Sequence, residues 1–259
     1  MSRLLFVKEG VAVWSSHLDL MRALMRAFRR AGIDLKHSQG FTPHPELSIL
    51  MPLSVGVESQ CEIAEFTLAE GCDIPASEIA ARMNPVLPAG LQALDSYEGG
   101  TKAGKLAWLR ARLVLEYEEP GTRHQAPGEA EEQSHCCAQN DRIEALRALF
   151  ARPSLVVEKH SKKGEVEMDI APMIRSCSVG AVIGHPQSGA GDGGCEFLAP
   201  LGMTGGDSVV IEAVVAAQNP TLNPLLLVTA IEKYLPEHKP EHVVCRRLEI
   251  YDADMNVFR

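Results

Sequence analysis

Residues 15–59 read SSHLDLMRALMRAFRRAGIDLKHSQGFTPHPELSILMPLSVGVES, and this stretch carries the strongest fold signal in the chain. Ser16 precedes an amphipathic run, and its hydroxyl can accept a backbone N–H while Asp19 reaches back from the third position. Gly32 is the residue type favoured just after the end of a helix. Together these residues predict a helix over residues 18–31.

Strand and helix patterns alternate through the rest of the chain. Strands are predicted at residues 4–8, 11–14, 47–51, 62–68, 91–97, 109–117, 155–159, 165–170, 209–215 and 242–251, with helices at 76–83, 141–151 and 223–234. The first two strands read as a hairpin. This order indicates an α+β protein made of two ferredoxin-like βαβ-type modules, with antiparallel sheets and helices packed on one face.

The two expected modules cover residues 1–100, which hold the opening motif, and residues 105–259. Two segments of the second module read as flexible loops. Residues 119–140 are polar and acidic without a helical or strand period, and residues 184–194 are rich in glycine.

Composition sets the class of protein. The chain has 259 residues, and its 46% apolar and 23% charged residues exclude wholesale disorder. No stretch approaches the ~18 apolar residues of a membrane span, and the first residues lack the features of a secretory signal. Seven cysteines, most of them isolated, fit free thiols in a reducing compartment. We therefore expect a cytoplasmic protein with no membrane partner.

The formal net charge of −9 excludes a protein coated in positive charge, but the first 50 residues hold seven Lys/Arg against four Asp/Glu. On the predicted helix an apolar stripe faces the sheet, formed by Leu18, Met21, Leu24, Met25 and Phe28. Four arginines fall on the adjoining arc: Arg22, Arg26, Arg29 and Arg30. Guanidinium groups match phosphate geometry, so the arc is a candidate phosphate-binding surface; a solvated basic face is the simpler alternative.

Downstream of the helix, Lys36 leads into a segment with an imidazole, a hydroxyl and an aromatic ring, stiffened by two prolines. Its candidate binding residues are His37, Ser38, Phe41 and His44. The segment is equally compatible with an inert turn, and Phe41 fills a core more readily than it stacks on a base. His17, in the first helical turn, completes a set of three histidines that could act as acid or base.

Other chemical motifs are weak or missing. His135, Cys136 and Cys137, with His124 upstream, lack the spacing of a structural zinc site. The chain has no phosphate loop and no nucleophile elbow, so we expect neither a metal nor a cofactor. Further basic residues could reach an anionic partner if their sheet faces the helix: Arg110, Arg112, Arg246 and Arg247.

The run FVKEG, followed by SHLDLMRALMRAFRRAGIDLKHSQGFTPHPELS and PLSVGVES, resembles the radical-SAM-linked protein family. This is a domain of unknown function that occurs alone or fused behind a cobalamin-binding radical SAM protein. The resemblance covers residues 3–68 most closely and weakens toward the C-terminus. It implies a radical SAM protein as partner and an association with RNA or ribosome maturation.

A radical SAM cluster needs cysteines in the Cys-x3-Cys-x2-Cys manner, and the seven cysteines include no such trio. The chain would therefore take part in trans. We expect a non-catalytic accessory module that binds RNA, or another phosphate-rich substrate, through the basic helix and the histidine loop. The alternatives are an enzyme that uses His17, His37 and His44 on RNA, and a domain that docks an acidic protein surface.

Overall fold

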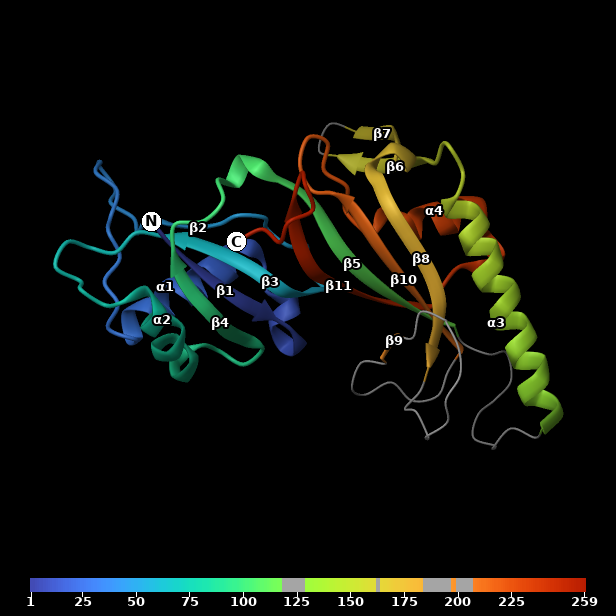
Figure 1. Cartoon of the computed structure of the whole chain (residues 1–259), viewed down its shortest axis with the longest axis horizontal. Coiled ribbons are helices and arrows are strands. Elements are labelled where there is room, and N and C mark those ends of the chain that lie inside the picture. Colours follow the sequence, from blue (N-terminus) through green and yellow to red (C-terminus); the bar gives the residue numbers. More distant parts are fainter. Residues whose placement is uncertain (118–128, 162–163, 184–196, 199–206) are drawn as a thin grey trace. The chain divides into compact units, whose positions relative to one another are not determined.

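The computed structural model of the chain describes residues 1–117, 129–161, 164–183, 197–198 and 207–259. It divides into two compact units (Figure 1). Unit 1 consists of Met1–Ala107 and Arg246–Arg259, and unit 2 consists of Trp108–Cys245. The last 14 residues, which sequence analysis assigned to the second module, thus belong to unit 1.

Unit 1 is built on antiparallel strands in the order β4-β1-β3, with the short β2 paired to β3 and with β11 next to β3. The bounds are β1 Ser2–Lys8, β2 Leu47–Ile49, β3 Val57–Phe66, β4 Leu91–Glu98 and β11 His242–Asp252, and the helices are α1 His17–Arg30 and α2 Ala76–Met83. The α+β class and the antiparallel pairing are confirmed. The ferredoxin-like description of the modules is not confirmed, because the C-terminal strand β11 joins the unit 1 strands next to β3.

Helix α1 is closed at both ends by the residues that predict it. The Ser16 hydroxyl accepts the N–H of Asp19 at 3.2 Å, as expected for an N-cap. Gly32 has φ +68°, which suits glycine. Its N–H donates to the Arg29 carbonyl, and the Ile33 N–H donates to the Phe28 carbonyl at 3.0 Å. This pair of bonds is a Schellman motif, which ends the helix and turns the chain toward the next segment.

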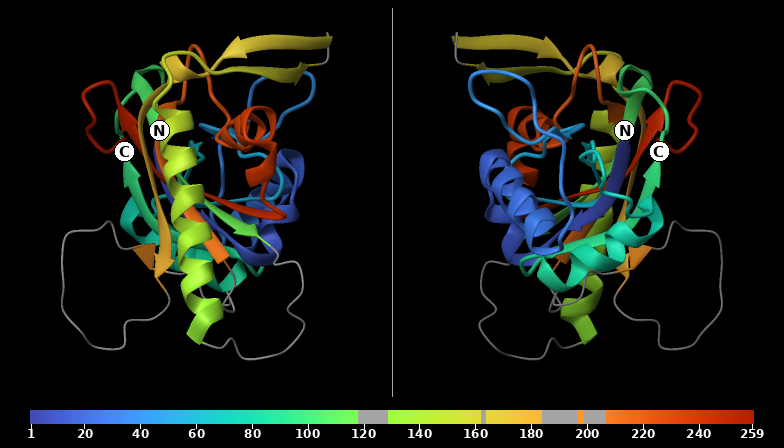
Figure 2. Two further views of the ribbon diagram at one scale, coloured as in Figure 1. Left: turned by 90° about the vertical axis from the view of Figure 1, so that its right-hand side faces the viewer. Right: turned by 90° about the vertical axis from the view of Figure 1, so that its left-hand side faces the viewer.

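Both helices of unit 1 pack on one face of its strands (Figure 2). The shared core contains Leu4 and Phe6 from β1, Ala64 and Phe66 from β3, Leu91 and Ala93 from β4, Leu20, Leu24, Ala27 and Phe28 from α1, and Ile79, Ala80 and Met83 from α2. Leu18, which we placed on the buried stripe, is exposed instead. The helix is rotated so that Leu20 and Ala27 face the strands.

The C-terminal segment completes unit 1. The Arg259 carbonyl accepts the Thr101 N–H at 2.6 Å, and Phe258 is fully buried beside the Arg3 guanidinium. A Cβ on Gly100, whose φ is +111°, would lie 2.9 Å from the Arg259 carbonyl oxygen, so only glycine fits this approach.

Unit 2 has the strand order β5-β10-β8-β9, with antiparallel β5–β10 and β10–β8 pairs and a parallel β8–β9 pair. A separate hairpin is formed by β6 and β7. The bounds are β5 Leu106–Tyr117, β6 Val156–Ser161, β7 Gly164–Asp169, β8 Ile174–Ile183, β9 Phe197–Leu198 and β10 Asp207–Ala216, with helices α3 Glu129–Phe150 and α4 Leu226–Tyr234.

Two predicted elements were wrong, and strand β8 was not predicted. The hairpin at residues 4–14 does not form, because Gly10–Trp14 is a 3-10 helix in which the Glu9 carbonyl accepts the Ala12 N–H at 3.1 Å. Helix α3 begins at Glu129, inside the predicted loop at 119–140. Strand β8 was missed because Arg175, Ser176 and Ser178 break the apolar alternation of its sequence. The predicted loop at residues 184–194 lies outside the described residues.

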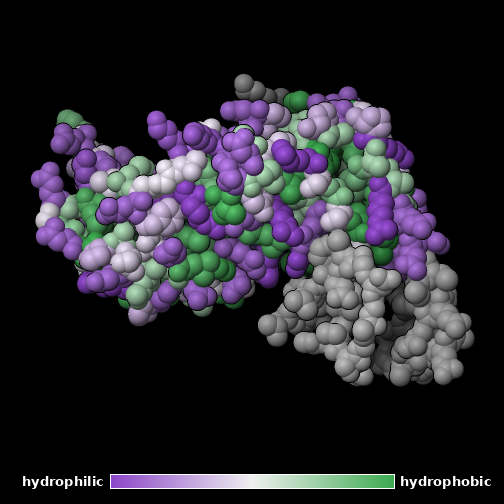
Figure 3. Space-filling view, viewed as in Figure 1, coloured by the Kyte–Doolittle hydropathy of each residue, from purple (hydrophilic) through white to green (hydrophobic). Residues whose placement is uncertain are grey.

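On the face of the molecule shown in Figure 3, hydrophilic side chains predominate and hydrophobic ones occur in separate groups. Within the described part of the chain, no helix combines the length and the apolar character that a bilayer crossing requires.

Candidate functional site

The four predicted arginines of α1 are all exposed, but they differ in their partners. Arg22 forms an ion pair with Asp19 at 3.4 Å, one helical turn away. Among the described residues, no carboxylate forms an ion pair with Arg26, Arg29 or Arg30. Arg29 and Arg30 lie in the last turn, where the helix dipole favours cations, and this helps α1 to tolerate uncompensated charge.

The start of α1 is explained by capping. The Ser16 hydroxyl donates to the Asp19 carboxylate at 2.7 Å and, with Arg22 nearby, this hydrogen bond lowers the pKa of Asp19 below its usual value. His17 is exposed in the same turn. Ser16 and Asp19 thus have a structural role that needs no ligand.

Residues 37–45, which we call the histidine loop, form a narrow ribbon. His37 and Pro45 form an isolated β-bridge, and the Ser38 N–H donates to the His44 carbonyl at 2.9 Å. At its base Lys36 pairs with Glu46 at 3.5 Å, so this predicted binding residue has a partner already. Phe41 lies in the turn of the ribbon and is fully exposed, so the expectation that it packs in a core was wrong.

The two histidines of the loop are held through Nδ1. His37 Nδ1 lies 3.0 Å from the Leu35 carbonyl oxygen. Because a carbonyl only accepts, Nδ1 carries the proton, and Nε2 of the neutral ring is left as an acceptor. His44 Nδ1 lies 3.0 Å from the Ser38 hydroxyl and 3.2 Å from the Thr42 carbonyl oxygen. Ser38 therefore orients His44, and this bond explains why both residues occur in the loop.

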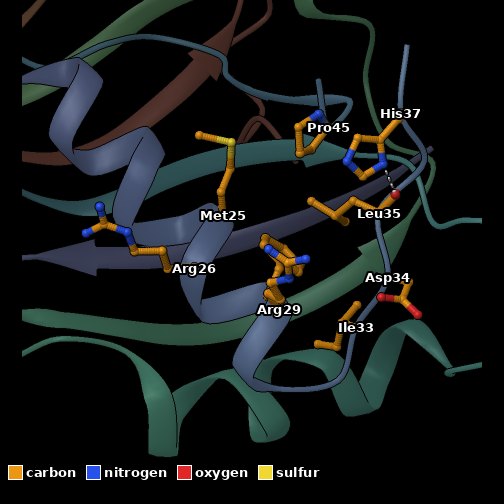
Figure 4. Close-up of a pocket in the computed structure, with 9 residues that line it drawn as sticks. Met25, Arg26, Arg29, Ile33, Asp34, Leu35, His37 and Pro45 are labelled. Atoms are coloured by element: carbon orange, nitrogen blue, oxygen red, sulfur yellow. Dashed lines mark hydrogen bonds between the residues drawn. The ribbon is translucent and has the colours of Figure 1, made fainter. Parts of the chain in front are cut away.

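A pocket of about 390 Å³ lies between α1 and the base of the histidine loop (Figure 4). Figure 4 shows Arg26, Met25 and Arg29 on the helix and His37 and Pro45 on the opposite side. The Schellman turn places the next residues along its edge. The full lining is Met25, Arg26, Phe28, Arg29, Ile33, Asp34, Leu35, His37 and Pro45. Two of the predicted arginines and one predicted histidine therefore share a concave site.

The three candidate acid–base histidines do not come together. His17 opens α1, whereas Arg29, which shares the pocket with His37, lies 12 residues further along the helix. At ~1.5 Å per residue this separates them by roughly 18 Å along the axis. His44 does not line the pocket that contains His37. This arrangement gives no support to an enzyme that combines all three rings.

The remaining basic candidates are on strands and are paired with carboxylates. Arg110 and Arg112 both bind Glu212, with Arg112 Nε 2.8 Å from the carboxylate. Arg246 Nε lies 2.7 Å from Glu58. Each of these arginines contacts a carboxylate within the fold, with Glu212 shared by two of them, and the expectation that they serve an external anion stays a prediction.

Arg247 belongs to a buried charged cluster that sequence analysis missed. It donates to Glu62 at 2.7 Å and to the Met51 carbonyl at 2.9 Å. Lys8 is also buried, and its ammonium lies 3.4 Å from the Ser15 carbonyl. Burial lowers the pKa of Lys8, and although the Glu62 carboxylate acts in the opposite direction, the pKa stays below its usual value.

Sequence analysis did not predict the other six lining residues of the pocket as site residues: Met25, Phe28, Ile33, Asp34, Leu35 and Pro45. For Ile33, Asp34 and Leu35 the signal is Gly32, because a Schellman turn redirects the chain and places the residues that directly follow it beside the end of the helix.

No group of three or more His, Cys, Asp or Glu side chains in the described residues is placed to hold a metal ion. The weak zinc candidate formed by His124, His135, Cys136 and Cys137 concerns side chains outside the described residues.

A comparison with protein-family models gives a match over most of the chain. Residues 2–224 match the model described as uncharacterized protein conserved in bacteria, DUF2344, and this span includes α1, the histidine loop and the pocket between them. No curated protein matches the chain. Since the match extends over far more than half of its residues, the chain belongs to the DUF2344 family.

Proposed function

We propose that the chain is a non-catalytic accessory module of a radical SAM system that binds single-stranded RNA through α1 and the histidine loop. The observation that carries the RNA part is the surplus of positive charge on α1. Arg26, Arg29 and Arg30 are exposed and have no ion pair among the described residues, whereas the strand arginines Arg110, Arg112, Arg246 and Arg247 are all paired.

Two features favour RNA over a rigid protein surface. Phe41 presents its whole ring to solvent in the turn of a short ribbon, and an exposed aromatic ring beside basic groups is typical of stacking on unpaired bases. Guanidinium groups bind phosphate through two parallel hydrogen bonds, which single-stranded RNA offers at every nucleotide. The arginines would thus hold the backbone while Phe41 stacks on a base.

The radical SAM partner is proposed from the sequence resemblance alone. Its test is affinity purification of the tagged chain from its native cell, followed by identification of bound proteins. The expected partner carries a Cys-x3-Cys-x2-Cys cluster motif. If the RNA is recovered without any such protein, the radical SAM part of the proposal falls and the RNA part stands.

The RNA part is tested by fluorescence anisotropy with a labelled single-stranded RNA over a series of salt concentrations. Three phosphate contacts predict a slope of log K against log[salt] of roughly −2, from about −0.7 per contact, and the triple variant R26Q/R29Q/R30Q should lose this slope. The matched control is R82Q on α2, an exposed arginine that Glu78 already pairs at 3.0 Å. A salt-independent affinity, or an equal loss in R82Q, would contradict the proposal.

The same titration addresses the other two functions considered. Enzymatic action on RNA predicts product from the isolated chain and its loss in H37A, while accessory binding predicts intact RNA after prolonged incubation. Docking of an acidic protein surface predicts that short RNA fails to bind at physiological salt.

A further inference from the structure

The pocket beside α1 has two chemically different kinds of lining. Phe28, Ile33 and Leu35 are buried apolar side chains, and Met25 and Pro45 are half-buried. Apolar surface of this kind suits a flat aromatic ring, because ring burial removes carbon atoms from water on both sides.

The polar groups of the pocket stand at its exposed edge. Arg26 and Arg29 lie about one turn apart on the same helix, and within the described residues neither pairs with Asp34, although all three line the pocket. In Figure 4 the Arg26 side chain extends away from Arg29, so the two guanidinium groups would hold one phosphate between them after Arg26 changes its rotamer, which its exposure allows. Asp34 supplies an acceptor for hydroxyl or amino groups, and His37 Nε2 supplies a second acceptor while the ring is neutral.

Size restricts the ligand further. A volume of about 390 Å³ is at the small end of the range of roughly 300 to 1,000 Å³ for small-molecule sites. The pocket therefore fits one small molecule with a flat ring, a polar middle and an anionic end, and it is too small for a segment of folded nucleic acid.

We infer that this pocket binds a single ribonucleotide that carries one phosphate, with the base on the apolar lining, the ribose near Asp34 and the phosphate on Arg26 and Arg29. The inference rests on the proposed RNA-binding function and deepens it: the pocket takes one nucleotide of the strand, while Arg30 and Phe41 contact its neighbours. Free mononucleotides carry the same chemistry and bind in the same way.

Isothermal titration calorimetry with three related probes tests this assignment. Adenosine 5′-monophosphate has the base, the ribose and the phosphate, adenosine lacks the phosphate, and ribose 5-phosphate lacks the base. We expect the nucleotide to bind at least tenfold more tightly than either fragment, because each fragment leaves one kind of lining unused. Equal affinity for ribose 5-phosphate and the nucleotide would overturn the inference, because the apolar lining would then contribute nothing.

The variants separate the pocket from the general charge of α1. R26Q and R29Q remove lining residues, and each should weaken nucleotide binding at least tenfold. R22Q is the matched control, since Arg22 is an exposed arginine of the same helix that pairs with Asp19 and does not line the pocket. M25W fills the pocket with a larger side chain and should also abolish binding; if M25W does not fold, the arginine variants decide. An equal loss in R22Q and R29Q would overturn the inference.

The two proposals fail in different ways. The same protein samples are titrated with single-stranded RNA bearing a terminal phosphate and with the same RNA bearing a terminal hydroxyl. RNA binding without binding of adenosine 5′-monophosphate rejects the pocket assignment and leaves the RNA function standing. Nucleotide binding without RNA binding rejects the RNA function and identifies a free nucleotide as the ligand. A preference for the terminal phosphate places the end of the strand in the pocket.

Discussion

Arginine occurs in two contrasting settings in this chain. On the strands, five arginines have a carboxylate partner within the fold: Arg3 with Glu65, Arg246 with Glu58, Arg247 with Glu62, and Arg110 and Arg112 with Glu212. On α1, Arg26, Arg29 and Arg30 have no such partner among the described residues. A protein with net charge −9 has carboxylates in excess, so their absence from this helix face is a property of the fold rather than of composition.

The strand arginines stabilise the fold through their carboxylate partners, whereas the α1 arginines remain available to bind an external anion. A buried carboxylate forms an ion pair with its arginine because an unpaired buried charge destabilises the fold. An exposed arginine is solvated by water and needs no partner within the protein. Substitutions in the two settings should therefore affect different measurements.

The largest effect is expected for E62Q. Glu62 is buried and compensates both Arg247 and, at longer range, Lys8, so neutralising it leaves two buried cations without their counter-charge. We expect a loss of about 3–5 kcal/mol in the free energy of unfolding, measured by urea denaturation. The matched control is E78Q, which breaks an exposed i,i+4 pair on α2 and should cost less than about 0.5 kcal/mol. An equal loss of stability in E62Q and E78Q would show that burial does not determine how much these ion pairs contribute to stability.

A smaller and pH-dependent effect is expected for E212Q. Burial by itself raises the pKa of Glu212, but the hydrogen bonds and charges of Arg110 and Arg112 outweigh it and hold the pKa below the usual 4.5. The unfolded chain therefore takes up this proton first as the pH falls, and the stability from Glu212 is present above pH 4.5 and is lost as the pH drops toward its folded pKa.

Denaturation at a series of pH values checks this prediction. At neutral pH E212Q should cost about 2 kcal/mol, the worth of hydrogen bonds to a charged group. The gap between E212Q and the unmodified chain should narrow below pH 4.5. A gap that stays constant with pH would mean that the carboxylate charge does not contribute.

The double variant R29Q/R30Q should change stability only slightly. Both residues lie in the last turn of α1, where a cation contributes roughly 0.3–1 kcal/mol through the helix dipole. R26Q lies outside this turn and serves as the comparison, with an expected change within about 0.5 kcal/mol. Thermal denaturation of R29Q/R30Q and of the unmodified chain checks this prediction. The difference in stability between the two proteins should be present at low salt and disappear at high salt. A loss as large as that of E62Q would place these arginines among the structural ones.

The smallest effect on stability is expected for F41A. Its ring is fully exposed, so truncation removes no buried surface, and the free energy of unfolding should change by less than about 0.5 kcal/mol. Affinity for single-stranded RNA should nevertheless fall by the equivalent of about 1–3 kcal/mol, the usual worth of stacking on one base. Anisotropy and denaturation on the same sample give both values. Unchanged RNA affinity would remove Phe41 from the proposed interface.

Local signals predicted α1 well. Ser16, Asp19 and Gly32 act within a few residues of themselves, and the predicted helix at 18–31 matches His17–Arg30 closely. The helical periodicity of residues 18–31 also predicted that Arg22, Arg26, Arg29 and Arg30 are exposed. The failures involve distant partners: β8 becomes a strand through its pairing with β10, which no local pattern in Arg175–Ser178 indicates.

The pocket was only half predictable for the same reason. Arg26, Arg29 and His37 stood out by residue type, but the residue types of Ile33, Asp34 and Leu35 gave no reason to select them as site residues. Likewise nothing in the sequence indicates that Glu62 meets Arg247, which lies 185 positions later. Such pairs are visible only when the chain is folded.

The membership of Arg246–Arg259 in unit 1 has a consequence for biosynthesis. A ribosome releases residues 1–107 long before it adds Arg247, Phe258 and Arg259, so the nascent N-terminal part emerges with Glu62 unmatched and with a gap where Phe258 belongs. Unit 1 therefore cannot complete its folding until the last residues of the chain have been synthesised. A chain truncated after residue 245 would have a destabilised unit 1, although most of that unit lies in the N-terminal part of the sequence.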